Sequence, residues 1–477
     1  MSVDSTIDAP LANEVDRFIG RLGSALGEQW APATRKWVAR APGRLDVMGG
    51  FAEYTGSLTL SYPLAGAVLV ALAPRNDQTV FVCALHHEGN GWAGQCSWPL
   101  ARFYGDGNRL ADPQAFAATL AACNCDGAGD IAAVLYALLE SKTAPHLGGG
   151  LTIGIRSALS GKVGVAAPAA TSVAAVLALA RALDLPLEPL QCAQLACRGQ
   201  NLLWGRCQGI ADSAAVLLSQ PGSLLQLRCQ TCEVLGTLPL PEGLALTGID
   251  CGARSPTANR KYIDARVAAF MGRNIIGRIL AAEATAGPPW EGHLSQLTVA
   301  DYVERFRDRL PTRINGADFL ARFGESGDPL TTIEPGRVYK VRSRTEHHIY
   351  ENARAHQFAE RLARAARTHE QQAILEAGEL MYASHWSYGQ RCGLGSIETD
   401  RLVSLLRSEG IANGIYGAKI SGRGAGGTIV VLHTDTDTAR QAILRVADEY
   451  AQRSKLDPEV LAGTSPGAHV WGVRQIT

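Results

Sequence analysis

Residues 41–57 read APGRLDVMGGFAEYTGS and follow a short predicted strand. Pro42 fixes the backbone before Gly43, and glycine lets a ligand approach the main chain closely. Arg44 carries a permanent positive charge suited to holding a phosphoryl group. We therefore expect a turn at residues 41–44 that serves a site. On its own, the same pattern also fits a structural turn.

A second glycine-containing loop, residues 161–170, reads GKVGVAAPAA and precedes a predicted apolar helix at residues 171–183. A loop of this kind directs unpaired N–H groups and the positive end of the helix dipole at one point, which favours phosphate. Pro168 is acceptable in the first turn, where its missing N–H would have had no partner. An alanine-packed helix start is the structural alternative.

A third loop, residues 419–428, reads KISGRGAGGT and leads into a β-branched strand. Four of the six residues 422–427 are glycine. Removing side chains from a turn brings its backbone close to a ligand or simply forms a bulged hairpin.

Composition narrows the functional class. The 477 residues predict two or three domains, or two large lobes sharing one site. Forty-five Lys+Arg balance forty-five Asp+Glu, which argues against binding dominated by nucleic-acid phosphates or anionic lipid. The most apolar long run, residues 163–183, is interrupted by polar residues, and the first ten residues do not resemble a secretory signal. We expect a cytoplasmic protein without nucleic-acid or membrane partners.

The chain has eleven cysteines and no recognisable export signal, so we expect reduced thiols. Cys229 and Cys232 form a C-x-x-C pattern inside an alternating segment, residues 225–234. At strand spacing they would point to opposite faces, and no second pair completes a zinc site.

The three loops gain specificity from their order. Together with residues 205–212, GRCQGIAD, they resemble the motifs of the GHMP small-molecule kinases, in the galactokinase branch and closest to its arabinokinases. The resemblance extends from about residue 37 to the end of the chain. It includes residues 248–252, 265–276, 346–352, 384–400, 416–428 and 465–467.

This resemblance implies an α+β fold of two lobes with the active site in the cleft between them. An N-terminal lobe, residues 1–215, would carry the first two loops, and a C-terminal lobe, residues 216–477, the third. The implied reaction is ATP-dependent phosphorylation of the anomeric hydroxyl of a free monosaccharide, with Mg²⁺. The oligomeric state is left open.

The resemblance also implies roles for individual residues. Asp212 falls on the catalytic aspartate, and Arg44 would keep it ionised and stabilise the transferring group. Sugar contacts would come from Glu53, Asp46, Gly50, Phe51, Gly209 and Tyr262. Nucleotide contacts would come from Gly164, Val165, Ala166, Ala167, Pro168, Ala169, Gly422, Gly424 and Gly426.

Two departures bear on the substrate and the metal. Galactokinases carry Glu-His-Thr-Asp at residues 50–53, which here are Gly50, Phe51, Ala52 and Glu53. Arabinokinases share the glycine and an apolar second residue but keep the aspartate, so an L-arabinose-like substrate is favoured. Galactose or another aldose is the alternative.

The second loop has Ala166, Ala167 and Pro168 where relatives carry a serine run. Gln200 and Ser172 replace acidic residues, one of them a glutamate that assists the metal. Thr171, Ser172 and Asp212 are the candidate Mg²⁺ ligands. A binding protein that has lost phosphoryl transfer is the competing hypothesis.

Other candidates are predicted to be structural. We expect Trp204 to pack between lobes rather than to stack on a nucleotide. His347, His348 and His385 lack a metal-ligand pattern, and we expect them to pack or to form hydrogen bonds.

Overall fold

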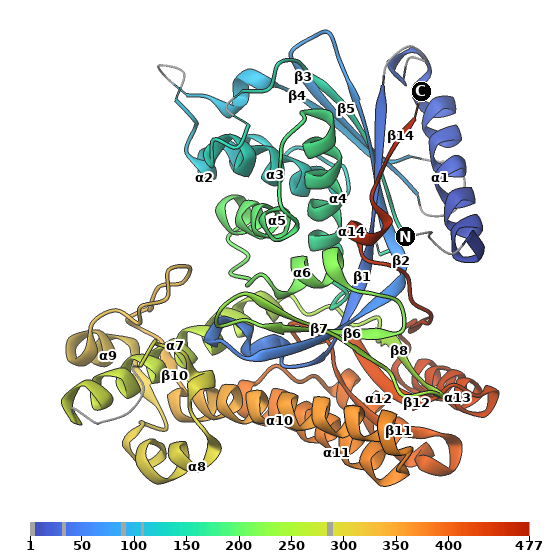
Figure 1. Cartoon of the computed structure of the whole chain (residues 1–477). Coiled ribbons are helices and arrows are strands. Elements are labelled where there is room, and N and C mark those ends of the chain that lie inside the picture. Colours follow the sequence, from blue (N-terminus) through green and yellow to red (C-terminus); the bar gives the residue numbers. More distant parts are fainter. Residues whose placement is uncertain are drawn as a thin grey trace.

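A computed structural model describes residues 5–30, 35–86, 92–105, 109–144, 146–159, 161–283 and 290–476. Helices and strands form one large and one small sheet, both covered by helices, and a separate two-stranded pair (Figure 1). The predicted α+β fold is confirmed.

The strands, in chain order, are β1 (Lys36–Met48), β2 (Leu58–Pro74), β3 (Thr79–Leu85), β4 (Trp92–Pro99), β5 (Leu151–Ser157), β6 (Ser223–Arg228), β7 (Glu233–Pro239), β8 (Leu244–Asp250), β9 (Ile314–Asn315), β10 (Val338–Tyr339), β11 (Ile415–Ile420), β12 (Thr428–Thr434), β13 (Glu459–Leu461) and β14 (Val473–Ile476).

The α-helices are α1 (Ser5–Leu26), α2 (Pro113–Thr119), α3 (Ala128–Glu140), α4 (Ala167–Ala182), α5 (Pro189–Trp204), α6 (Ala211–Leu218), α7 (Ala258–Glu283), α8 (Val299–Asp301), α9 (Gly316–Phe323), α10 (Val341–Thr368), α11 (Gln371–Ser387), α12 (Ile397–Glu409), α13 (Asp437–Ser454) and α14 (Ala468–Trp471). A short 3₁₀ helix, η2 (Gly50–Thr55), follows β1.

The central strands β1 and β2 of the large sheet are buried on both faces, whereas β7 at its edge is not. The strand order of this sheet is β14-β1-β2-β5-β3-β4, and β6 and β7 extend it from the other half of β2. Alternate side chains of a strand point to opposite faces. Leu69 and Ala71 of β2 accordingly pack with α1, whereas Val68 and Val70 pack into the main core with α3, α4 and α5.

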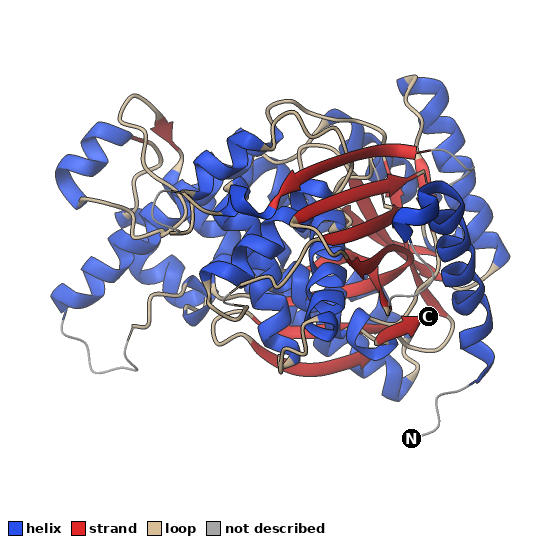
Figure 2. Cartoon of the chain, turned by 90° about the horizontal axis from the view of Figure 1, so that it is seen from above, coloured by secondary structure: helices blue, strands red, loops and turns tan. Residues whose placement is uncertain are grey.

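The small sheet has the order β11-β12-β8-β13. Helices α12 and α13 share a core with Ile429 and Val431 of β12, whereas Val430 and Leu432 join the core that includes α10 and α11. Helices α7, α8 and α9 build a further cluster with the start of α10. Seen from above, this helical part lies to one side of both sheets (Figure 2).

The large sheet does not end where the N-terminal lobe was expected to end. Strands β6, β7 and β14 follow residue 215 in the chain yet belong to this sheet. The division into residues 1–215 and 216–477 stays a prediction.

Four local expectations were wrong. Residues 41–44 are no turn, because β1 runs through them and absorbs the irregularity in a bulge between Pro42 and Arg44. The alternation of residues 58–72 and 79–85 predicts two paired strands, but the corresponding β2 and β3 are separated by β5. Cys96 and Cys123 form a disulfide, while the nine other cysteines are free. Cys229 and Cys232 occupy the turn between β6 and β7, not a strand.

Candidate active site

Arg44 and Asp212, which are 168 residues apart in sequence, form an ion pair. Arg44 leaves β1 just after the bulge, and Asp212 lies in the first turn of α6. The Arg44 Nε and Nη2 atoms donate to Asp212 Oδ1 at 2.9 and 2.6 Å. Although burial opposes it, the charge of Asp212 raises the pKa of Arg44. The predicted proximity of these two residues is confirmed.

The second and third loops lie against each other, backbone to backbone. Thr428 N donates to Val163 O at 2.9 Å, and Ser421 Oγ donates to Gly164 O at 3.0 Å. Gly164 has φ +90°, and a Cβ there would lie 2.7 Å from Ser421 O. Only glycine satisfies both the left-handed backbone and this close approach.

Arg44 also donates from Nη1 to Gly164 O at 2.7 Å, and its own N–H donates to Val165 O. The Arg44 guanidinium therefore joins the second loop to Asp212 of α6. Gly164 joins the second loop to the third loop. The three glycine-containing segments, residues 41–57, 161–170 and 419–428, therefore meet around Arg44.

Asp46, two residues further along β1, lies in a buried cluster of polar groups. Its carboxylate accepts hydrogen bonds from the N–H groups of Gly50 and Gly422 and from the Tyr388 hydroxyl. The Lys419 ammonium lies 3.5 Å from Asp46 Oδ2. These contacts fix the third loop onto β1, and a sugar contact of Asp46 stays a prediction.

Phe51 and Tyr262 belong to an aromatic cluster between η2 and the helices of the C-terminal part. Phe51 is buried, and its ring lies edge-on to that of Tyr262, with 5.4 Å between the ring centroids. The Tyr262 hydroxyl donates to Cys207 O, and the Arg423 guanidinium lies over its ring. Tyr262 therefore supports the loop that leads to Asp212.

Glu53 also reaches this loop. Its Oε1 accepts from Gly209 N at 3.0 Å and its Oε2 from Ala211 N at 3.1 Å. Burial, together with the charge of Asp212, raises the pKa of Glu53 to about 7, although the two backbone donors oppose the shift.

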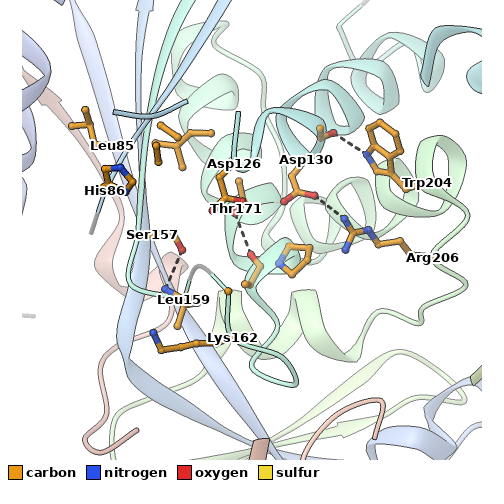
Figure 3. A pocket seen from close by; sticks show the side chains of 18 residues that line it. Leu85, His86, Asp126, Asp130, Ser157, Leu159, Lys162, Thr171, Trp204 and Arg206 are labelled. Atoms are coloured by element: carbon orange, nitrogen blue, oxygen red, sulfur yellow. Dashed lines mark hydrogen bonds and ion pairs between the residues drawn. The ribbon is translucent and has the colours of Figure 1, made fainter. Parts of the chain in front are cut away.

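A cavity of about 430 Å³ opens beside the start of α4 (Figure 3). Of the residues predicted to bind nucleotide or metal, Ala167, Pro168 and Thr171 line it. The described lining residues include neither Gly422 nor the pair Arg44–Asp212. The described residues that line the cavity are Ala84, Leu85, His86, Ala93, Asp126, Gly127, Gly129, Asp130, Ile155, Ser157, Leu159, Gly161, Lys162, Ala167, Pro168, Thr171, Trp204 and Arg206.

The other predicted nucleotide contacts are mostly packing residues in this structure. Val165 and Ala169 are buried in the main core, and Ala166 takes the left-handed N-cap position of α4. A Cβ on Gly424 or Gly426 would lie 2.5 Å from Leu394 O or 3.0 Å from Ala253 O. Their roles toward a nucleotide stay predictions.

Asp130 and Arg206 are cavity residues that have no signal of their own in the sequence. Trp204, expected to pack between lobes, lines the same cavity and donates from Nε1 to Gly129 O, and its place between lobes stays a prediction. Asp130 and Arg206 lie beside it and form an ion pair of 3.4 Å (Figure 3). No local pattern marks these residues, because α3 and the end of α5 meet only in the fold.

Asp130 is held by Gln200, which also binds Ser172; the resemblance implies acidic residues at both of these partner positions. Gln200 Nε2 donates to Asp130 Oδ1 at 3.0 Å and to Ser172 Oγ at 2.6 Å. Burial raises the pKa of Asp130 to about 6, although Arg206 and Gln200 oppose the shift. Gln200 and Ser172 are fully buried, whereas Asp130 reaches the cavity wall.

The histidines behave as expected. His347 Nδ1 lies 2.8 Å from Ser387 Oγ, His348 Nδ1 lies 2.8 Å from Thr55 Oγ1, and His385 Nε2 lies 3.2 Å from Asp400 Oδ1. Among the described residues, no group of three His, Cys, Asp or Glu side chains is arranged to hold a metal on its own. No described helix has the length and apolar character needed to cross a membrane.

The fold and two segments of the sequence match a known class. Residues 131–220 match the GHMP kinases N terminal domain, and residues 362–452 match the GHMP kinases C terminal. The Lactococcus lactis galactokinase, solved with galactose, has a TM-score of 0.69 and 16% identity over 97% of this chain and 100% of that one. The Methanococcus jannaschii mevalonate kinase has a TM-score of 0.53 and 11% identity over 92% and 98%. The chain belongs to the GHMP kinase superfamily.

Characterised relatives lie in the sugar-kinase part of that superfamily. An L-arabinokinase of Arabidopsis thaliana is 31% identical over 489 residues, which cover 92% of this chain. The chain spans about half of that relative, 47% of its length. A galactokinase of Chloroflexus aurantiacus is 24% identical over 90% of this chain and 92% of its own length.

Proposed function

We propose that this protein is a sugar 1-kinase that transfers the γ-phosphoryl group of ATP to the anomeric hydroxyl of a free aldose, L-arabinose or a close relative. The contact between Arg44 and Asp212 carries the proposal, because it joins a fixed cation and an acid at the junction of three glycine loops. The relatives named L-arabinokinase and galactokinase support the substrate class.

Phosphoryl transfer asks the protein mainly for positioning and for neutralisation of charge. Asp212 accepts the proton of the anomeric hydroxyl while the O1–P bond forms and the bond from the γ-phosphorus to the β–γ bridging oxygen breaks. ADP leaves, and the proton passes from Asp212 to solvent. Arg44 pairs with the Asp212 carboxylate and offsets negative charge on the transferring group.

The residues at the cavity fit a Mg²⁺ ion that is carried mainly by the nucleotide phosphates. Mg²⁺ usually keeps several waters and takes one or two carboxylates besides phosphate. Asp130 and the Thr171 hydroxyl line the cavity, and Gln200 Oε1 behind them is buried without a partner among the described residues. Asp130 and Thr171 would hold the metal, which would neutralise phosphate charge. Ser172 is less suited because its hydroxyl is buried against Gln200.

The test is incubation of the purified protein with ATP, Mg²⁺ and a panel of free aldoses that includes L-arabinose and D-galactose. Phosphorus NMR should show a sugar 1-phosphate and ADP, with the highest kcat/KM for L-arabinose. A folded protein that phosphorylates no aldose would contradict the proposal, and a preference for D-galactose would make it a galactokinase.

The second candidate is a binding protein that has lost transfer. It is favoured by one observation, the alanines and proline at residues 166–168 together with Gln200, in place of hydroxyl and acidic groups. Calorimetry separates the two: sugar binding without any Mg²⁺-dependent affinity for ATP is the result that a binding protein would give.

A further inference from the structure

The loop that carries the catalytic aspartate is held by Glu53 through its backbone. We infer that Glu53 is a positioning residue, which fixes residues 209–212 so that Asp212 faces Arg44, rather than a direct ligand of the sugar. The inference rests on the proposed function for its kinetic part only.

The geometry of the Glu53 carboxylate supports this assignment. Each oxygen accepts one backbone N–H, from Gly209 at 3.0 Å and from Ala211 at 3.1 Å. A Cβ on Gly209 would lie 2.7 Å from Glu53 Cδ, so the loop can approach the carboxylate this closely only with glycine there. Both oxygens are therefore committed to the loop backbone.

The second of these bonds lies directly beside the catalytic residue. Ala211 is the first residue of α6 and Asp212 the next. The first N–H groups of a helix have no partner within it, and a negative charge there is favourable. Glu53 supplies the acceptor for one of these N–H groups, and it thereby fixes the peptide unit between Ile210 and Ala211, one residue before Asp212.

Other side chains hold the earlier part of the same loop. Arg423 donates to Arg206 O, and Tyr262 and Arg266 donate to Cys207 O. Asn201 donates to Gln208 O and accepts from Gln208 N. Cys197 Sγ donates to Gly209 O at 3.2 Å, so these contacts reach residue 209, and Glu53 continues the support to residue 211.

The length of the side chain matters. An aspartate side chain is shorter by one C–C bond, about 1.5 Å. From the same backbone position, its carboxylate cannot reach the N–H groups of both Gly209 and Ala211. If the carboxylate only bound the sugar, the aspartate that arabinokinases carry here should be tolerated. If it positions the loop, the loss of either bond should loosen residues 209–212.

Hydrogen–deuterium exchange of the full chain tests this without turnover. Glu53→Gln and Glu53→Asp should speed amide exchange in peptides covering residues 205–213 by about tenfold or more. Glu233→Gln, at an exposed ion pair with Arg228, is the control and should leave exchange unchanged. Unchanged exchange in both Glu53 variants, with native far-UV circular dichroism, would overturn the inference.

Kinetics give the second readout. Misplacement of Asp212 should lower kcat by roughly 10- to 100-fold while the KM for sugar stays within about threefold. A large rise in KM with kcat preserved would instead identify Glu53 as a sugar ligand and overturn the inference. If the wild-type protein phosphorylates no aldose, the proposed function fails, but the exchange experiment still decides the role of Glu53.

Discussion

At the residue scale, one guanidinium connects most of the site. Arg44 is nearly fully buried, and it donates to Asp212 and to Gly164 O. A buried charge is tolerated when it is paired and hydrogen-bonded. The two hydrogen bonds from Arg44 hold the Asp212 carboxylate in one orientation, whereas the carboxylate of an unpaired surface acid would rotate freely.

The first prediction concerns Asp212. Asp212→Asn keeps the size of the side chain but cannot accept the sugar proton, so kcat should fall by roughly 10²- to 10⁴-fold. Steady-state assays with the best aldose measure this, and a thermal melt should show a folded protein. Asp437→Asn, at an exposed ion pair with Arg440, is the matched control. Turnover of Asp212→Asn close to wild type would exclude an acid–base role.

The second prediction concerns Asp130. Asp130→Asn should weaken Mg²⁺-dependent binding of a non-hydrolysable ATP analogue by about tenfold, because the cavity loses a carboxylate. Calorimetry with and without Mg²⁺ measures the change, and affinity without the metal should stay the same or rise. Gln200→Glu in the Asp130→Asn background should restore part of the loss. Equal losses with and without Mg²⁺ would show that Asp130 serves only its ion pair with Arg206.

The third prediction is a pH dependence of stability. The pKa of Glu53 is about 7 in the folded protein, against 4.5 ordinarily. Between these values the folded state binds more protons than the unfolded state, so the free energy of unfolding should fall as pH rises through this window. The loss is about 3 kcal/mol at most. Six other titratable groups interact electrostatically with Glu53: Asp212, Arg44, Tyr262, Cys197, Cys229 and Cys232.

Urea unfolding at pH values from 5 to 8 checks the sign. The decline should be smaller in Glu53→Gln, which carries no ionisable group at this position, and unchanged in Glu233→Gln. An increase of wild-type stability across the window that Glu53→Gln abolishes would contradict the prediction.

At the scale of elements, the two glycine loops work as a pair. Gly164 has φ +90° and lies against Ser421 O, whereas Gly161, in the same loop, has φ +74° and open space around its missing Cβ. This contrast separates the cost of a left-handed backbone from the cost of close packing.

The fourth prediction uses this contrast. Gly161→Ala should lower the free energy of unfolding by about 1 kcal/mol, and Gly164→Ala by about 2–4 kcal/mol, because its methyl group also displaces the third loop. Denaturant unfolding of both variants measures the difference. Equal effects of the two substitutions would mean that the loops are not held together at Gly164.

The sequence was informative about these elements to an uneven degree. A continuous apolar run located the helix α4, because its alanines and valines are buried on most sides. The sequence pattern missed that β1 continues through Pro42, since a bulge looks like a turn in sequence. The convergence of the three loops came from resemblance alone. Asp130 had no local signal, and the Cys96–Cys123 pair depends on the approach of residues 27 positions apart.

At the scale of the whole molecule, the two ends of the chain are tied to the strand that carries Arg44. Strand β14 pairs with β1 over Lys36–Ala39. Next along β1, Arg40 donates to Glu14 of α1, to Ser465 Oγ and to Ala65 O. Glu14 also accepts from Arg156 of β5. The site strand is therefore braced by segments more than 400 residues apart.

The last prediction tests this brace. Arg40→Ala should lower the free energy of unfolding by about 3–5 kcal/mol, because Glu14 and Ser465 lose a buried partner. Arg40→Lys should recover only part of this, since an ammonium cannot reach all three acceptors in the geometry of a guanidinium. The hydrogen-bond partners of Arg40 are Glu14, Ser465 and Ala65, which lie outside the site around Arg44. At a temperature where Arg40→Ala stays folded, the KM for ATP or sugar should therefore change little. Thermal unfolding and steady-state kinetics measure both effects. A loss of activity that exceeds the loss of folded protein would mean that the brace sets the geometry of the site as well as its stability.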